Sequence, residues 1–114
     1  MTSVTVPSEI EGKPVTTIAE RALSSKSKLL KVTLPDSVTT IESRAFNDCS
    51  HLRSVDMGNG VKTIGTFGFS GCNELTSITL SENLTEIGES AFNQCSTLTE
   101  LALPDSVVTI GNGV

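Results

Sequence analysis

Apolar residues recur along the chain at a constant interval of 23 residues. Six sets of positions repeat in this way, and we call each set a column. Followed from its first member in steps of 23 residues, each column stays apolar to its last member. The six columns begin at Ile18, Leu23, Leu29, Val32, Leu34 and Val38. An interval shared by six columns indicates a chain built from structural repeats.

Within one repeat, the segment LRSVDM predicts a β-strand. Val55 and Met57 alternate with the polar residues Ser54 and Asp56, and a period of two is typical of a strand with one buried face. A turn signal follows, either Pro-Asp-Ser or Gly-Asn-Gly. A second extended segment, VKTI, comes next with its first and last residues facing inward.

The rest of the repeat, ESRAFNDC, places Ala45 and Cys49 four residues apart and predicts one or two turns of α-helix or 3₁₀ helix. A single repeat cannot bury its apolar side chains, whereas stacked repeats can, because each column then becomes a continuous row. We therefore expect a solenoid of about four to five rungs, a rung being one 23-residue turn of the coil. Its longer strands lie side by side and parallel on one face, which we call the main sheet.

Charge and hydropathy exclude two classes of partner. The net charge of −5 argues against nucleic acid, whose phosphates would be repelled. No segment reaches the ~20 apolar residues of a membrane-spanning helix, so we expect no membrane insertion. All eight Lys and Arg lie between Lys13 and Lys62; residues 1–62 therefore carry a net charge of +1 and residues 63–114 a net charge of −6.

The repeat LxxVxLPDSVTxIxxxAFxxCxxL resembles the BspA-type leucine-rich repeat from about Val4 to Ile110. This resemblance implies a curved, right-handed leucine-rich-repeat solenoid with its parallel strands on the concave face. It also implies an extracellular or cell-surface location, because the family is found in surface proteins of bacteria and some protozoan parasites. Several relatives are implicated in adhesion, whereas the N-terminus of this chain has no signal-peptide pattern.

We expect a single repeat domain over residues 1–114, with units near 4–31, 32–54, 55–77 and 78–100 and a partial unit at 101–114. In the first unit, Lys26 replaces the cysteine of later units, and an ammonium group is costly in a dry interior. This unit is therefore predicted to be a solvated end, with the insertion SEIEGKP shielding its edge. The chain stops half-way through a unit, so we expect a fragment of a longer protein.

Cys49, Cys72 and Cys95 form a column of their own. They could be a structural row, could undergo partial oxidation or bind an adventitious metal, or could include a functional thiol. Tetrahedral zinc needs four ligands around a point, and parallel side chains in a row do not aim at one another. Free cysteine also packs as a small apolar residue and is often buried. The pattern favours the structural row.

No other group of residues predicts catalysis. His51 lies in a polar column and is interpreted as a surface residue, and no GxSxG, P-loop, GxGxxG or HExxH motif is present. Glu86 and Glu89 could bind Ca²⁺ or act as acid and base, but Glu86 lies in an outward threonine column. We therefore expect neither an enzyme nor a metal or other cofactor. Asn83 begins the glycosylation sequon NLT.

The outward side chains of the main sheet remain as a candidate contact surface. They are small hydroxylated and charged groups that grade from basic to acidic along the coil. The predicted protein-contact residues are Lys31, Thr33, Arg53, Ser54, Asp56, Thr76, Ser77, Thr79, Thr99 and Glu100. Tight interfaces favour Trp, Tyr and Arg, of which this surface has only Arg53, so a weak or multivalent contact is expected.

These observations favour a non-enzymatic protein-binding or adhesion module of a secreted or cell-surface protein. Its expected partner is a host or bacterial surface protein. The alternative is a purely structural spacer without a ligand. Basic first rungs, acidic last rungs and an uncapped C-terminal edge also predict weak head-to-tail self-association.

Overall fold

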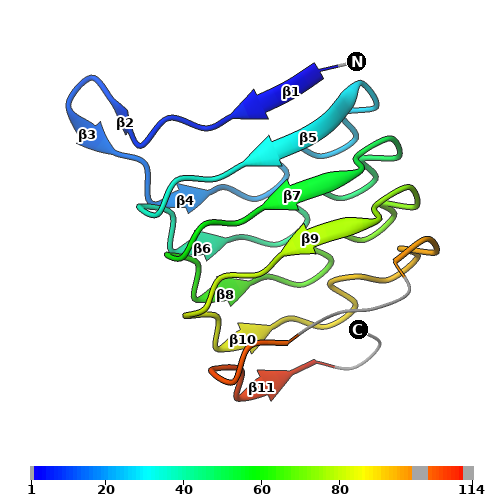
Figure 1. Cartoon of the computed structure of the whole chain (residues 1–114). Helices are drawn as coiled ribbons and strands as arrows, with labels where there is room; N and C mark the ends of the chain where they lie inside the picture. Colours follow the sequence, from blue (N-terminus) through cyan, green and yellow to red (C-terminus); the bar gives the residue numbers. More distant parts are fainter. Residues whose placement is uncertain (1, 99–102, 112–114) are drawn as a thin grey trace.

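The computed structural model describes residues 2–98 and 103–111, and in it the chain forms a solenoid of parallel β-strands (Figure 1). Each rung passes through one strand of a main sheet and one strand of a second sheet behind it. Partners on neighbouring strands are 23 residues apart in most rungs, such as Val32, Val55 and Ile78. The predicted leucine-rich-repeat solenoid with a 23-residue repeat is confirmed.

The main sheet has four strands in the order β1-β5-β7-β9, all parallel. They are β1 (Thr2–Thr5), β5 (Leu29–Thr33), β7 (Ser54–Asp56) and β9 (Ser77–Thr79). Val32 and Val55 point inward and are 0% and 2% exposed. The residues on either side of them therefore face outward, as the period of two requires.

The second sheet has five parallel strands in the order β11-β10-β8-β6-β4. They are β4 (Thr17–Ile18), β6 (Thr40–Ile41), β8 (Thr63–Ile64), β10 (Glu86–Ile87) and β11 (Thr109–Ile110). Each strand has a polar residue outward and an isoleucine inward. Four strands in one sheet and five in the other agree with the four to five rungs that were predicted.

The insertion in the first unit forms an antiparallel hairpin of β2 (Glu9–Ile10) and β3 (Lys13–Pro14). Glu11 and Gly12 at its tip both have positive φ, 53° and 79°, which is typical of a tight hairpin turn. The hairpin stands at the corner of the coil between β1 and β4 (Figure 1). Lys26, in the same unit, is exposed, which confirms the prediction of a solvated position.

The helical turns predicted for the third side of each rung are wrong: the described residues contain no helix. Arg44 and Asp48 both have a φ of 58°, and the corresponding positions of the other rungs are also left-handed. A left-handed residue every four positions ends a right-handed helix before it can propagate. The two N–H groups donate instead to the neighbouring rung, at Thr66 O and Ser70 O (3.0 and 2.7 Å).

The core is a thin layer of stacked columns between the two sheets. The rings of Phe46, Phe69 and Phe92 stack along the coil, with centroids 4.9 and 5.5 Å apart and planes inclined by 2°. The inward isoleucines of β4, β6, β8 and β10 are 6%, 0%, 0% and 1% exposed. Each rung therefore completes the burial of its neighbour, which is how a repeat too small to fold alone gains stability.

Candidate functional site

The outward residues of the main sheet lie in two columns that cross the strands. Lys31, Ser54 and Ser77 are register partners, and so are Thr33, Asp56 and Thr79. Because neighbouring parallel strands are about 4.8 Å apart, side chains in one column stand next to one another across the sheet. We call the outward side of β5, β7 and β9 the contact face.

A shallow hollow of about 200 Å³, the first hollow, lies in the contact face. Five of its six lining residues were predicted as contact residues, and the sixth is the buried Val55. The lining residues are Lys31, Ser54, Val55, Asp56, Ser77 and Thr79. Serine side chains are short, so the surface drops between the longer side chains around them. The hollow thus presents an ammonium group, a carboxylate and three hydroxyl groups.

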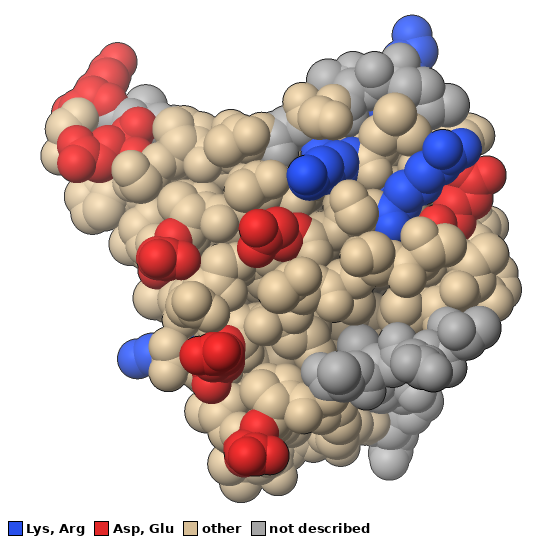
Figure 2. Space-filling model, viewed as in Figure 1, with Lys and Arg blue, Asp and Glu red and all other residues tan. Residues whose placement is uncertain are grey.

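The charged groups around the first hollow are open to solvent. Lys31 and Asp56 are exposed, and Asp56 Oδ1 accepts a hydrogen bond from the N–H of Gly58 at 3.1 Å. Arg53 Nε lies 4.0 Å from Glu74 Oε2, and these side chains are 67% and 44% exposed. In Figure 2, Lys and Arg gather toward the upper right of this view, while acidic side chains follow its left margin. Exposed charges of this kind guide a partner more than they stabilise the fold.

The other predicted contact residues lie around the first hollow rather than in it. Arg53 and Thr76 directly precede β7 and β9, and the Thr76 hydroxyl donates to Arg53 O at 3.4 Å. Thr33 is half-buried at the end of β5. Thr99 and Glu100 lie outside the described residues.

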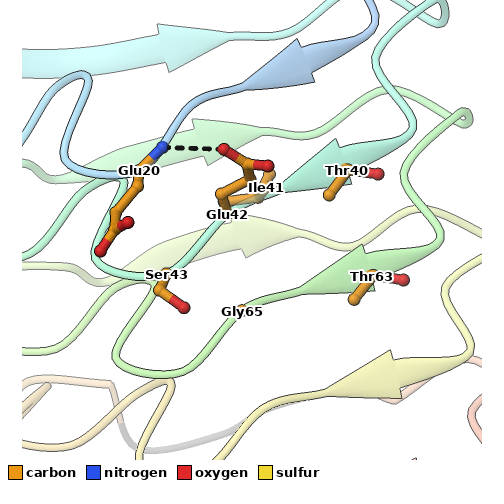
Figure 3. Close-up of a pocket in the computed structure, with 7 residues that line it drawn as sticks. All are labelled: Glu20, Thr40, Ile41, Glu42, Ser43, Thr63 and Gly65. Carbon is orange, nitrogen blue, oxygen red and sulfur yellow. Dashed lines mark hydrogen bonds between the residues drawn. The ribbon is translucent and has the colours of Figure 1, made fainter.

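A second hollow, of about 280 Å³, lies at the second sheet and was not predicted. Its lining residues are Glu20, Thr40, Ile41, Glu42, Ser43, Thr63 and Gly65 (Figure 3). Glu42 Oε1 accepts a hydrogen bond from the N–H of Glu20 at 3.0 Å, so this carboxylate is held against the neighbouring rung. Five of its seven lining residues carry a hydroxyl or carboxylate group.

Gly65 lines the second hollow, and its backbone packs closely against the preceding rung at Glu42 and Ser43. A Cβ on Gly65 would lie 2.6 Å from Ser43 N and 2.7 Å from Glu42 C, closer than real Cβ atoms approach. Gly88 and Gly111 continue this column, whereas Ala19 and Glu42 occupy it in the earlier rungs. The change from Glu42 to glycine in this column is the sequence signal of this close approach between rungs.

The three cysteines are free and buried, as the structural interpretation predicted. Each Sγ donates to a carbonyl 26 residues earlier: Cys49 to Leu23, Cys72 to Phe46 and Cys95 to Phe69, at 3.0, 3.2 and 3.2 Å. Interaction with the Cys49 thiol and burial raise the pKa of Cys72, and the same interaction lowers the pKa of Cys49. Burial raises the pKa of Cys95 to about 11. Each thiol thus links one rung to another.

Metal-ligating side chains do not gather within residues 2–98 and 103–111: no group of three or more His, Cys, Asp or Glu is placed to hold an ion. His51 is half-buried and its Nδ1 lies 3.3 Å from Ser50 Oγ. The groups on the contact face can make hydrogen bonds and ion pairs. This is the chemistry of recognition between surfaces.

The BspA-type leucine rich repeat region matches residues 1–114 in six copies. The chain belongs to the BspA-type leucine-rich repeat family. This confirms the resemblance seen in the repeat LxxVxLPDSVTxIxxxAFxxCxxL. The comparison with curated proteins finds no match.

Solved structures of bacterial leucine-rich repeat proteins share the BspA-type coil. A leucine rich repeat protein of T. pallidum is 35% identical with a TM-score of 0.95, over 97% of this chain and 52% of that one. One from Bacteroides ovatus is 33% identical with a TM-score of 0.86, over 96% and 29% of the two chains. A leucine rich cell surface protein of Faecalibacterium prausnitzii is 30% identical with a TM-score of 0.67, over 95% and 37%.

This BspA-type chain thus spans about half the length of the T. pallidum protein and less than a third of the B. ovatus protein. Within the part of the chain that the structure describes, no helix has the length and apolar character needed to cross a bilayer.

Proposed function

We propose that this chain is a non-enzymatic protein-binding module of a secreted or cell-surface leucine-rich-repeat protein. The observation that carries the proposal is the first hollow on β5, β7 and β9. Its ammonium, carboxylate and hydroxyl groups point outward from a sheet whose opposite side is packed into the core at Val32 and Val55. A rigid support of this kind holds the backbone of these residues in place and so lowers the entropic cost of binding.

The charges of the first hollow favour a protein partner with complementary charges. Lys31 and Asp56 lie on neighbouring strands, two register positions apart across the sheet. A partner that places a carboxylate at Lys31 and a cationic side chain at Asp56 would satisfy both groups. Exposed ion pairs contribute little individually, so each repeat domain binds weakly and repetition along a longer protein supplies avidity.

Family membership supports a role at the cell surface. The F. prausnitzii relative is named as a leucine rich cell surface protein. A surface protein with an exposed polar sheet can act as an adhesin toward host or bacterial surface proteins.

The test compares charge reversal on the contact face with an equal reversal elsewhere. The face variant carries Lys31→Glu and Asp56→Lys, and the matched control carries Lys62→Glu and Glu86→Lys, which are exposed residues at the second sheet. Both variants keep the net charge of −5. Binding is measured by surface plasmon resonance against purified host-matrix proteins and bacterial surface proteins, with the chain immobilised at several densities.

We expect the face variant to lose about tenfold or more in affinity and the control to bind as the parent chain does, since reversed charges meet like charges. Equal loss in both variants would contradict binding through the contact face. If no tested protein binds at any density, the spacer interpretation takes the place of this proposal.

A further inference from the structure

The turn between β7 and β8 has the sequence Gly58-Asn59-Gly60, and its packing requires both glycines. Gly58 has a positive φ of 67°, a left-handed conformation that favours glycine. A Cβ on Gly60 would overlap Asp36 O and would lie 2.7 Å from Val38 O, closer than real Cβ atoms approach the backbone. The close approach of the preceding rung therefore fixes glycine as the residue that follows Asn59.

An asparagine followed by glycine is a chemically reactive pair. The glycine nitrogen can reach the side-chain amide carbon of the preceding residue, because glycine has no Cβ to hinder the approach. Asn59 is exposed, and no hydrogen bond of its side chain or of the Gly60 N–H is found within residues 2–98 and 103–111. The other asparagines in these ranges are followed by larger residues; they are Asn47, Asn73, Asn83 and Asn93.

We propose that Asn59 is a site of spontaneous deamidation, a covalent modification that consumes water and needs no enzyme. Hydroxide removes the proton of the Gly60 N–H, and this nitrogen bonds to Asn59 Cγ. The bond from Cγ to the side-chain nitrogen breaks, and that nitrogen takes a proton from water and leaves as ammonia. Water then opens the resulting cyclic imide at either carbonyl carbon, which leaves a carboxylate at position 59 and a proton that the ammonia takes up. The product is an aspartate or an isoaspartate, whose main chain runs through Cβ.

The new carboxylate would join a row of acidic residues. Asp36, Asn59, Glu82 and Asp105 follow one another at intervals of 23 residues, and all four are exposed. The Asn59 N–H donates to Asp36 Oδ1 at 2.9 Å, so these two residues lie against each other in neighbouring rungs. Like charges that face each other on neighbouring strands are destabilising, and the same repulsion acts between neighbouring turns. Asn59 is the uncharged member of this row, and deamidation would remove the gap.

The isoaspartate product would also change the backbone of the turn. Its main chain is one methylene longer, because it passes through Cβ. The backbone of Asn59 is held on both sides: its N–H donates to Asp36, and its carbonyl accepts a hydrogen bond from Asn83 Nδ2. A longer main chain cannot keep both contacts in their present geometry. Deamidation therefore lowers the stability of a central rung as the protein ages.

The first measurement follows the mass of one peptide. Trypsin cuts after Arg53 and Lys62 and releases residues 54–62, in which Asn59 is the one asparagine. The folded chain is incubated at mildly acidic and at mildly alkaline pH and then digested briefly. The peptide is expected to gain the mass of an amide-to-acid change and to separate into two products by chromatography. The gain should be faster at the higher pH, because hydroxide takes the first proton.

Two controls isolate the reaction at Asn59. Asn112, which also precedes a glycine, is replaced by glutamine in every chain, so that the peptide of residues 63–114 reports on the asparagines followed by larger residues. That peptide is expected to keep its mass. Asn59→Gln is the matched variant: its longer side chain places the amide carbon one bond further from the Gly60 nitrogen, and its peptide is also expected to keep its mass.

A synthetic peptide of residues 54–62 gives the rate of the reaction without the fold. The folded chain is expected to react within about tenfold of this rate, since exposed turns open at little cost in free energy. A slower reaction would show that the turn protects Asn59 and would overturn the proposal. An equal gain of mass in the Asn59→Gln chain would also overturn it.

The second measurement is the urea midpoint of unfolding at low and high salt. Asn59→Asp is expected to unfold at less urea than Asn59→Gln at low salt, and added salt should reduce the difference because it screens the row of carboxylates. The isoaspartate fraction of the incubated chain, purified by chromatography, is expected to unfold at less urea than Asn59→Asp at both salt concentrations. Equal midpoints for Asn59→Asp and Asn59→Gln would contradict the effect of charge, and equal midpoints for Asn59→Asp and the isoaspartate chain would contradict the effect on the backbone.

Discussion

Ile64 and Ile110 occupy the same column of the second sheet, but Ile64 is fully buried and Ile110 is 48% exposed. The two side chains are identical and both belong to strands of the sequence Thr-Ile. They differ only in their neighbours, because β8 has a strand on each side and β11 has a described neighbour on one side. In a solenoid, burial is thus a property of position along the coil. Five predictions test this difference, in order of decreasing effect.

The largest effect is expected in the middle of the aromatic stack. Phe69→Ala removes a ring that contacts those of Phe46 and Phe92, and should lower the free energy of unfolding by about 3–5 kcal/mol. Phe67→Ala is the matched control: this ring is half-buried with Arg44 Cζ 4.7 Å from its centroid, and its loss should cost about 1 kcal/mol. Urea unfolding at equilibrium measures both. Equal losses would contradict a core confined to the stacked columns.

The same substitution should have different effects at Ile64 and Ile110. Ile64→Ala leaves a cavity between two rungs and should cost about 2–5 kcal/mol of unfolding free energy. Ile110→Ala removes a half-exposed side chain and should cost less than about 1 kcal/mol. Both are measured under conditions in which the chain is monomeric. Similar values would show that the ends of the coil are as well packed as its middle.

Adding a methyl group at Gly65 should also destabilise the middle of the coil. The new Cβ would meet backbone atoms of Ser43 and Glu42, and overpacking of this kind costs about 1–3 kcal/mol. Glu42→Ala changes the same column in the preceding rung, where a Cβ is already present, and should cost about 0.5 kcal/mol. Thermal unfolding of the two variants gives the comparison. If Gly65→Ala left the unfolding temperature unchanged, the two rungs could move apart without loss of stability.

Alkaline pH should weaken the rung that contains Cys95. Burial raises the pKa of this thiol from 9.0 to about 11, so the unfolded chain loses the proton at a lower pH than the folded chain. The contribution of the Cys95 thiol to the free energy of unfolding is present in full below pH 9 and is lost as pH rises toward 11. Over this range the folded state binds more protons than the unfolded state does. Cys95→Ser should therefore show a shallower fall in unfolding free energy over the same range. An unchanged slope would contradict the raised pKa.

The smallest effect is expected at the surface ion pair beside the contact face. Arg53 Nε and Glu74 Oε2 are 4.0 Å apart and their side chains are largely exposed. A double-mutant cycle of Arg53→Ala and Glu74→Ala should therefore give a coupling below about 1 kcal/mol. A larger value would show that surface charge, and not the buried columns, contributes to stability in this part of the coil.

The columns could be predicted from the sequence because each one stays apolar over four or five repeats. One repeat alone would be ambiguous, but a ladder of equivalent residues has few other ways to be buried. The outward position of the residues that line the first hollow followed from the same alternation, since residues beside Val32 and Val55 must face outward; the hollow itself was not predicted. The second hollow could not be predicted from the sequence, because its shape depends on how the backbones of neighbouring rungs lie against each other, as at Gly65.

The turns of the third side could not be predicted from residue spacing. Ala45 and Cys49 are four residues apart, which suits one helical turn and suits two successive tight turns equally well. The left-handed residues that decide between them include Arg44, Phe67 and Gln94, which are not typical of such positions. Their conformation is imposed by hydrogen bonds to the next rung, such as that from Phe67 N to Glu89 O. Long-range contacts therefore override local preference on this side.

The three thiols, each hydrogen-bonded to another rung, can also report when the part of the coil around each of them opens. An alkylating reagent can modify Cys49, Cys72 or Cys95 only after the local structure around each one opens. Because the three side chains are chemically alike, the rates of their modification rank the opening free energies of successive parts of the coil. We expect Cys95, which is nearest the exposed edge, to react first and Cys72, which lies between the other two, to react last. The order in which the three cysteines are modified therefore gives the order in which the rungs around them open.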